Sequence, residues 1–167
     1  EVIVPDLINF FLYTAYDDCV KYKLLAGSFA NKIKSQIFIH IVEQYRKTLE
    51  KALHSSKNFN PPESLKELIA LAKDHVSLGN ITGEGWLLTA EMISLIKNGI
   101  NNIICLQPFG CLPNHIVGKG MIRELLHSYP QANIVPIDCD SGASEVNQLN
   151  RIKLMLAVAF EKIKEHK

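Results

Sequence analysis

Hydrophobic residues in the first third of the chain recur every three or four positions, which is the spacing of one helix face. The apolar run at residues 2–4 predicts a short strand, and Asp6 is placed to cap a helix that reaches about Leu25. Ser28 can cap a second helix that extends to about Ser55. The residues expected to face the core are Leu7, Ile8, Phe11, Leu12, Ala15, Tyr16 and Cys19 on the first helix, and Ile33, Ile37, Ile41, Tyr45 and Leu49 on the second.

Short apolar runs alternate with helical patterns after a polar linker at residues 56–62. Alternation of this kind predicts parallel strands joined by right-handed crossovers. We therefore expect an α/β fold, with a small Rossmann-like parallel sheet and flanking helices, preceded by the two long N-terminal helices. The expected strands lie at residues 75–78, 103–106 and 133–137, and the expected helices at residues 63–74, 86–97, 114–128 and 145–165.

The chain is short enough for a single α/β domain over residues 1–167, with a helical part at 1–60 and an α/β part at 61–167. Because it opens inside an apolar run and without a Met, we expect it to be a fragment of a larger multidomain chain. The last helix carries an apolar stripe that we expect to pack inward. Its members are Val146, Leu149, Ile152, Leu156, Ala159, Phe160 and Ile163.

Three loops follow the expected strands, at residues 79–85, 107–114 and 138–144. The carboxyl ends of parallel strands meet at one edge of a sheet, and ligands of open α/β sheets bind outside that edge. We therefore expect the polar side chains of these loops and of the following helix to lie within reach of one another. They are Gln107, Cys111, Asn114, Asp138, Asp140, Asn147 and Arg151.

The overall charge and hydropathy exclude two classes of partner. Lys and Arg number 18 against 17 Asp and Glu, so the formal net charge is +1, which by itself does not indicate a partner. The sequence shows no basic stripe that could pair with nucleic acid phosphates. No apolar run approaches the roughly 20 residues that a bilayer-spanning helix needs. The four cysteines are widely spaced and form no C-x-x-C motif, which indicates a reducing, cytoplasmic location.

Cys111 is the best candidate for metal chemistry, because it lies in a loop with proline and glycine rather than on a strand. An iron–sulfur cluster needs several converging thiolates, about four in most clusters. Cys105 alternates toward one face of its strand and is expected to be buried, whereas Cys139 follows a strand end and can converge on Cys111. Either other parts of a larger chain supply the remaining ligands, or the site is not a cluster.

Other chemistry remains open at the same edge. Cys111 can act as a nucleophile if His115, four residues later, serves as its base and Asp138 orients that base. Asp138 and Asp140 can bind a metal as a pair, although acids between a strand and a helix are commonly caps.

A glycine-rich loop, GNITGEG, precedes the helix that begins at Trp86. Gly83, Glu84 and Gly85 are candidates for binding an anion, since free N–H groups at a helix start attract negative charge. The spacing matches neither a P-loop nor a dinucleotide-binding motif. The alternative is a tight turn that allows helices to cross closely.

Two segments resemble a known family. NIICLQPFGCLPNHIVGKGMIREL at residues 102–125 and NIVPIDCDSGASEVNQLNRIKLML at residues 133–156 resemble the C-terminal region of large CoA-substrate-specific enzyme activase-like proteins. These proteins are relatives of the 2-hydroxyacyl-CoA dehydratases of anaerobes. VIVPDLINFFLY and GNITGEGWLLTAEM, further upstream, resemble the same region, so the resemblance covers nearly all of the chain.

The resemblance implies a multidomain parent protein with an ATP-binding activator module of the acetate kinase and actin type. In the family, activators use ATP hydrolysis to pass an electron to the dehydratase, whose subunits hold [4Fe-4S] clusters between Rossmann-like domains. The chain contains no activator motif, so we do not expect it to be an active enzyme alone. The expected partners are other domains of the same chain and an acyl-CoA dehydratase.

Cys111 is the residue that the resemblance implies as a cluster ligand. Other matched residues are expected to surround the cluster or to anchor a ligand: Gln107, Asn114, His115, Glu145, Asn147, Asn150 and Arg151. The alternative from a different functional class is a non-catalytic scaffold or docking domain whose polar loops bind a partner domain.

Overall fold

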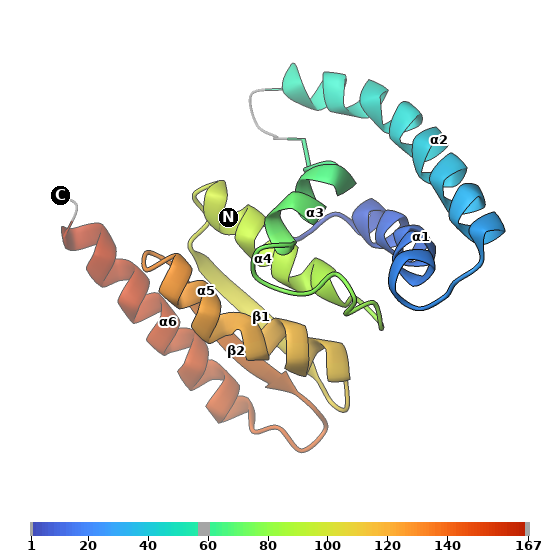
Figure 1. Cartoon of the computed structure of the whole chain (residues 1–167). Coiled ribbons are helices and arrows are strands. Elements are labelled where there is room, and N and C mark those ends of the chain that lie inside the picture. The colour runs from blue at the N-terminus through green and yellow to red at the C-terminus, as the bar shows by residue number, and fades with distance from the viewer. Residues whose placement is uncertain (1, 57–60, 166–167) are drawn as a thin grey trace. The chain divides into compact units, whose positions relative to one another are not determined.

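The computed structural model describes residues 2–56 and 61–165 of the chain (Figure 1). It divides into two compact units, Glu1–Glu91 and Met92–Lys167. The first unit is helical, and the second holds a parallel sheet with helices, so the chain has a mixed α/β fold. The boundary between the units lies inside helix α4, Trp86–Lys97.

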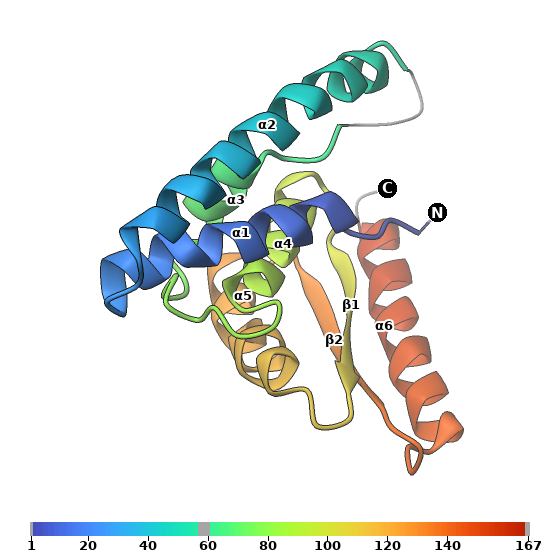
Figure 2. The same ribbon diagram turned by 90° about the vertical axis from the view of Figure 1, so that its right-hand side faces the viewer.

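The first unit contains α1 (Leu7–Leu24), α2 (Phe29–His54), α3 (Leu65–Ala72) and the first half of α4. Helices α1 and α2 run in opposite directions and pack together (Figure 2). Local signals in the sequence set the helix starts. Asp6 accepts a hydrogen bond from the backbone N–H of Ile8 at 2.8 Å, and Ser64 and Glu67 form a capping box at the start of α3.

Two strands predicted for the first unit do not form. Residues 2–4 are exposed coil, and residues 75–78 are a turn that continues from α3. The backbone N–H groups of His75 and Val76 both donate to the carbonyl oxygen of Ala72, at 2.9 Å each. A strand needs a neighbour to receive its backbone hydrogen bonds, and the turn satisfies these groups locally instead.

Aromatic rings lie at the centre of the first unit. The Tyr13 and Trp86 side chains are fully buried, and their rings meet edge to face with centroids 5.2 Å apart. The buried part of this core consists of Leu12, Tyr13, Leu65, Leu68, Ala72, Trp86, Leu87 and Ala90. Gly85, at a φ of +46°, lies so close to the Tyr13 hydroxyl and the Asn80 carbonyl that no side chain fits there.

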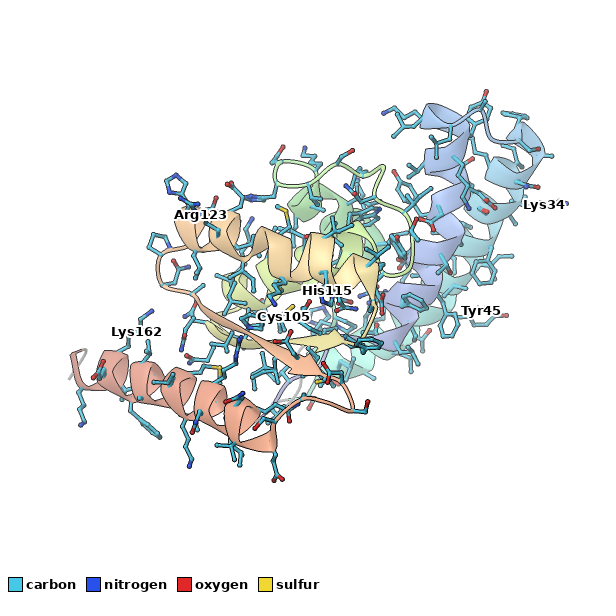
Figure 3. All side chains as sticks on the ribbon, turned by 90° about the horizontal axis from the view of Figure 1, so that it is seen from below. Lys34, Tyr45, Cys105, His115, Arg123 and Lys162 are labelled. Atoms are coloured by element: carbon cyan, nitrogen blue, oxygen red, sulfur yellow. The ribbon has the colours of Figure 1, made fainter. Side chains whose placement is uncertain are left out.

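Helix α2 presents the opposite face to the one that its apolar pattern predicts. The predicted inner residues are all exposed: Ile33, Ile37, Ile41, Tyr45 and Leu49. Figure 3 shows Tyr45 projecting from the outer side of α2, where its exposed fraction is 77%. The buried residues of the helix are instead two polar ones, Ser35 and Arg46. Ser35 donates a hydrogen bond to Asp18 of α1 at 3.1 Å.

The guanidinium of Arg46 joins α2 to α1 and to the segment before α3. Its side chain is 3% exposed, and it donates hydrogen bonds to the Asn9 side-chain oxygen at 2.6 Å and to the Glu63 carbonyl oxygen at 2.9 Å. Carboxylates surround it: Asp6 at 3.2 Å, Glu50 at 3.4 Å and Glu43 at 4.0 Å. Satisfying this buried cation requires α2 to turn Arg46 inward, which overrides the apolar pattern.

Asp17 is a second buried charged group on the inner face of α1. Its side chain is 7% exposed, and one of its oxygens has no hydrogen-bond partner within the described residues. Burial raises the pKa of Asp17 to about 7, with Lys21 opposing the shift and Asp18 adding to it. Burial also raises the pKa of Glu91 to about 8.

The second unit is built on β1 (Asn102–Pro108) and β2 (Asn133–Cys139), which pair in parallel as predicted. Cys105 lies opposite Pro136, and Gln107 opposite Asp138. Within the described residues the sheet has these two strands, since the third predicted strand is absent. Helices α5 (Ile122–Ser128) and α6 (Glu145–Glu165) lie on opposite faces of the sheet (Figures 2 and 3).

The single helix predicted at residues 114–128 is wrong. The segment forms a π-helical turn, η1 (Asn114–Gly118), a short 3₁₀ turn, η2 (Lys119–Met121), and then α5. A Cβ at position 120 would lie 3.2 Å from the His115 carbonyl oxygen, so the glycine allows the wide turn to close on its own backbone. Such π-turns often accompany functional sites.

Helix α6 also rotates away from its predicted orientation. Val146, Leu149, Leu156, Phe160 and Ile163 are exposed, and the inner face consists of Gln148, Ile152, Met155, Ala159 and Lys162. Polar anchors fix this rotation. The side chain of Gln148 donates to the Asp138 carbonyl oxygen at 2.7 Å, and the Lys162 ammonium donates to the Gln131 carbonyl oxygen at 2.9 Å.

The Arg46 cluster gives a direct stability prediction. Replacing Arg46 with Met leaves the surrounding carboxylates and the Asn9 amide without their cation, so we expect the free energy of unfolding to fall by about 3 kcal/mol. The matched control is Lys47→Met on the exposed side of the same helix, for which we expect a change within about 0.5 kcal/mol. Urea denaturation measures both. Equal values for the two variants would contradict the role given to Arg46.

Asp17 gives a prediction on pH. Its raised pKa means that between about pH 4 and pH 7 the folded state keeps a proton that the unfolded chain has lost, so stability falls as the pH rises through this range. Asp17→Asn removes this loss, and we expect the variant to exceed the parent by on the order of 3 kcal/mol at pH 8 and to match it near pH 4. The control is Asp74→Asn, at an exposed position. Parallel stability curves for Asp17→Asn and the parent would refute the assignment.

Candidate functional site

The loops that follow β1 and β2 lie at the same edge of the sheet in the second unit. The backbone N–H of Phe109 donates to the Cys139 carbonyl oxygen at 3.1 Å, so the two segments stay side by side where they leave β1 and β2. Two of the three predicted loops therefore meet, as parallel pairing requires. The third, at residues 79–85, belongs to the first unit and follows a turn rather than a strand.

Cys111 lies in the turn after β1 and is partly exposed. Its backbone N–H donates to the Pro108 carbonyl oxygen at 3.1 Å, and Gly110 adopts a φ of +70° that closes the turn. The side-chain amide of Asn114 donates a hydrogen bond to the Cys111 sulfur at 3.0 Å. Asn114 is itself 7% exposed, so this donor amide is buried. The sulfur is thus both reachable and oriented.

His115 does not contact the thiol through its ring. Its Nδ1 lies 2.8 Å from the carbonyl oxygen of Cys111, which places a ring nitrogen on the backbone rather than on the sulfur. Asp138, the proposed orienting group, is bonded elsewhere, to Lys119 at 3.4 Å. The three residues therefore do not form the connected set that a cysteine nucleophile with a histidine base requires.

Gln107 lies inside the unit instead of at the rim. It is 1% exposed, and its amide nitrogen donates to the Cys105 sulfur at 3.1 Å and to the Leu106 carbonyl oxygen at 3.2 Å. Burial raises the pKa of the Cys105 thiol, as expected for a sulfur that stays protonated in the interior. Gln107 thus supports Cys105, while Cys111 remains the accessible thiol on this loop.

Asp138 is at the centre of an ionic group at the end of β2. Its carboxylate lies 3.4 Å from the Lys119 ammonium and 4.0 Å from the Arg151 guanidinium. Arg151 also donates to the Pro136 carbonyl oxygen at 2.9 Å, which ties α6 to the strand end. All three charged groups are more than 40% exposed, so these pairs contribute little to stability and remain accessible to solvent.

The other predicted residues of α6 have a different environment from Arg151. Glu145, Asn147 and Asn150 are exposed on the first turns of the helix. Arg151, in contrast, reaches the sheet through its hydrogen bond to the Pro136 carbonyl oxygen. Lys119 contacts Asp138 without any signal in the local sequence pattern, whereas Gln148, which donates to the Asp138 carbonyl oxygen, belongs to the motif SEVNQLNR.

The other metal candidates at this edge, Cys139 and Asp140, have contacts of their own. Cys139 is exposed, and its thiol lies 3.6 Å from the Ile137 carbonyl oxygen. Asp140 accepts a hydrogen bond from the Gly142 backbone at 2.7 Å, as a turn-forming aspartate does. Within residues 2–56 and 61–165, no group of three or more His, Cys, Asp or Glu residues is placed to hold a metal ion.

Several N–H groups of the candidate anion loop and of the helix start that follows it are bonded within this segment. Those of Gly85 and Trp86 donate to the carbonyl oxygens of Thr82 and Asn80, at 3.2 and 2.9 Å, and that of Leu87 donates to Glu84 at 3.0 Å. A helix start whose donors are already bonded offers few N–H groups to an anion. The geometry instead favours the tight-turn alternative, in agreement with the crowding at Gly85.

No protein-family model matches the chain, and neither does any curated protein or solved structure. In the described part of the chain, no helix combines the length and the apolar character needed to cross a bilayer. The functional inference therefore rests on the sequence motifs and on the geometry of the loops after β1 and β2.

Proposed function

We propose that the chain is a domain of a 2-hydroxyacyl-CoA dehydratase-like or activase-like protein of an anaerobe. In this proposal the Met92–Lys167 unit is Rossmann-like, and Cys111 is one thiolate ligand of a [4Fe-4S] cluster. The observation that carries the proposal is the hydrogen bond of 3.0 Å from the Asn114 amide to the Cys111 sulfur, at a partly exposed position on the carboxyl edge of the sheet.

The motifs QPFGCLPNH and SEVNQLNR support the proposal, because the strand ends from which they extend are neighbours in the second unit. Hydrogen bonds to ligand sulfurs are one of the means by which proteins adjust the reduction potential of a cluster. Asn114 supplies such a bond from a buried amide, so the sulfur is oriented before any ligand arrives. This arrangement suits a ligand position better than a structural thiol.

The described residues do not by themselves fit a complete cluster. Among residues 2–56 and 61–165 no set of three or more metal-binding side chains converges, and Cys105 is committed to the interior. The proposal therefore requires that other domains of a longer parent protein, or a partner subunit, provide the remaining thiolates. A bound cluster would supply one-electron transfer, and the residues of this chain would position one of its ligands.

In this role the domain belongs to a cytoplasmic system that delivers electrons to a dehydratase acting on CoA esters. Its partners are the other domains of its own chain and that dehydratase. The Asp138, Lys119 and Arg151 group lies at the end of the neighbouring strand, where it can contact a partner domain or an anionic substrate group. The isolated domain has no catalytic activity in this proposal.

The proposal predicts a specific dependence on Cys111. In the parent protein prepared without oxygen, Cys111→Ser is expected to lower the iron and sulfide content and the broad visible absorbance of the cluster. The matched control is Cys19→Ser, a partly exposed cysteine of the helical unit, which should retain both. Asn114→Ala is expected to keep the cluster but to change its reduction potential. Unchanged iron and sulfide content in Cys111→Ser would refute the proposal.

A docking domain is the second candidate, and the exposed apolar faces of α2 and α6 favour it. On α2 the exposed fractions of Ile37, Ile41 and Tyr45 are 55%, 49% and 77%. On α6, Leu149 and Phe160 are 44% and 60% exposed. Contiguous apolar surface of this kind marks protein–protein contact sites in soluble proteins. The two candidates are compatible, since a cluster shared between domains also requires their surfaces to meet.

The docking candidate predicts that the outer face of α2 is dispensable for folding. The double variant Ile37→Ala, Ile41→Ala is expected to change the free energy of unfolding, measured by urea denaturation, by less than about 1 kcal/mol. Leu68→Ala, at a position that is 1% exposed, is the control and is expected to cost about 2–5 kcal/mol. A double variant as unstable as Leu68→Ala would contradict a docking role for this face.

A further inference from the structure

The first unit contains a groove between α1, α2 and α3 that takes no part in the proposed function. Its volume is about 800 Å³, within the range of roughly 300–1,000 Å³ that is typical of small-molecule sites. All the residues that line the groove belong to this one unit. Its size matches a small organic molecule rather than a single ion.

The walls of the groove are mainly apolar. Tyr16 lines it from α1, Ile39 from α2, and Leu65 and Ile69 from α3. Ile39 and Ile69 are partly buried against the core, so their positions are fixed by packing. A ligand with an unbranched apolar chain would remove this surface from water, which is the main source of affinity in such sites.

The charged residues of the groove are mostly cations. Lys23, Lys32 and Lys66 contribute ammonium groups, and Lys32 lies 4.5 Å from the centroid of the Tyr22 ring. Within the described part of the chain, Lys23 and Lys66 have no ion-pair partner. An uncompensated set of cations at the border of an apolar groove is complementary to an anionic group attached to an apolar chain.

Glu43 is the acidic residue that lines the groove, and it is already engaged. Its carboxylate lies 4.0 Å from the Arg46 guanidinium and accepts a hydrogen bond from the Leu65 backbone at 3.4 Å. Arg46 is shared with Asp6 and Glu50, so it compensates the charge of Glu43 only in part, but three lysines outnumber this one carboxylate in the groove. The net charge that the groove presents to a ligand is positive.

We propose that this groove is a binding site for an amphipathic anion, a single apolar chain that ends in a carboxylate. The apolar chain lies against Tyr16, Ile39 and Ile69, and the carboxylate is held by the lysines. The proposal does not depend on the cluster, because Cys111 belongs to the other unit. Cys111→Ser is therefore expected to leave binding unchanged, which separates the two proposals experimentally.

The single Trp of the chain reports on the groove. The ring of Tyr16, which lines it, meets the Trp86 ring edge to face with centroids 6.1 Å apart. Trp86 is fully buried, so its emission does not respond to probes in bulk solvent alone. Displacement of Tyr16 by a bound chain is expected to change the Trp86 fluorescence.

The test compares decanoate with decyltrimethylammonium, which carries the same chain with the opposite charge, on the full chain and below micelle-forming concentrations. Calorimetry and Trp86 fluorescence measure binding. We expect one decanoate per chain, bound about tenfold or more tightly than the cation. Equal affinities for the two probes, or binding of several molecules per chain without saturation, would overturn the proposal.

Matched lysine variants locate the site. Lys32→Gln with Lys66→Gln is expected to weaken decanoate binding about tenfold, because both ammonium groups line the groove. Lys34→Gln with Lys47→Gln removes the same charge from the exposed side of α2, where Figure 3 labels Lys34, and is expected to have no effect. An equal loss in both double variants would show that only net charge matters, which would refute a site in the groove.

An apolar pair of variants completes the test. Ile69→Ser, within the groove, is expected to weaken decanoate binding, whereas Ile41→Ser, on the outer face of α2, is expected to leave it unchanged. Circular dichroism confirms that both remain folded, and Ile69→Val provides a milder change if Ile69→Ser unfolds. Loss of binding in Ile41→Ser alone would transfer the site to the outer face and overturn the proposal.

Discussion

The parallel pairing of β1 with β2 is the constraint on which the candidate site depends. A parallel pair forces the chain to leave both strands at the same edge, and the bond between Phe109 and Cys139 extends this proximity into the loops. Cys111 and Asp138 are 27 residues apart in the sequence (138 − 111), because the crossover through η1, η2 and α5 lies between them. The direction of the strands therefore determines which side chains meet at this edge, and the identity of those side chains determines what chemistry they can perform.

Buried polar groups, rather than apolar stripes, set the rotation of the two long helices. In α2 the Arg46 guanidinium must reach Asn9 and the Glu63 carbonyl, and in α6 the Gln148 side chain must reach the Asp138 carbonyl. An uncompensated buried cation costs far more than an exposed isoleucine, so the polar contacts determine which side faces inward. The apolar residues that this leaves outside are the reason that a docking role is plausible on physical grounds.

The parts of the fold that were predictable are those set by local signals. The bounds of α1, α2, α4, β1, β2 and α6 follow from caps, glycines and prolines that act within a few residues. The strands predicted at residues 2–4 and 75–78 failed because strand formation depends on a partner that the sequence does not identify. For the site, strand order was enough to place Cys111 near β2, but the bond from Asn114 and the backbone contact of His115 depend on the π-turn, which no periodicity indicates.

The incomplete ligand set at Cys111 and the exposed face of α6 occur in the same unit, and together they limit how the proposed cluster can form. A single thiolate binds a cluster only when a second protein surface supplies the other ligands. That surface must also pack against the residues that surround Cys111. The apolar residues of α6 can contribute to such an interface without taking part in the fold, since they are exposed here. In the proposed arrangement, ligand sharing and docking would be two consequences of one interface: Asn114 orients the Cys111 sulfur within the unit, and the other surface would bring the remaining ligands.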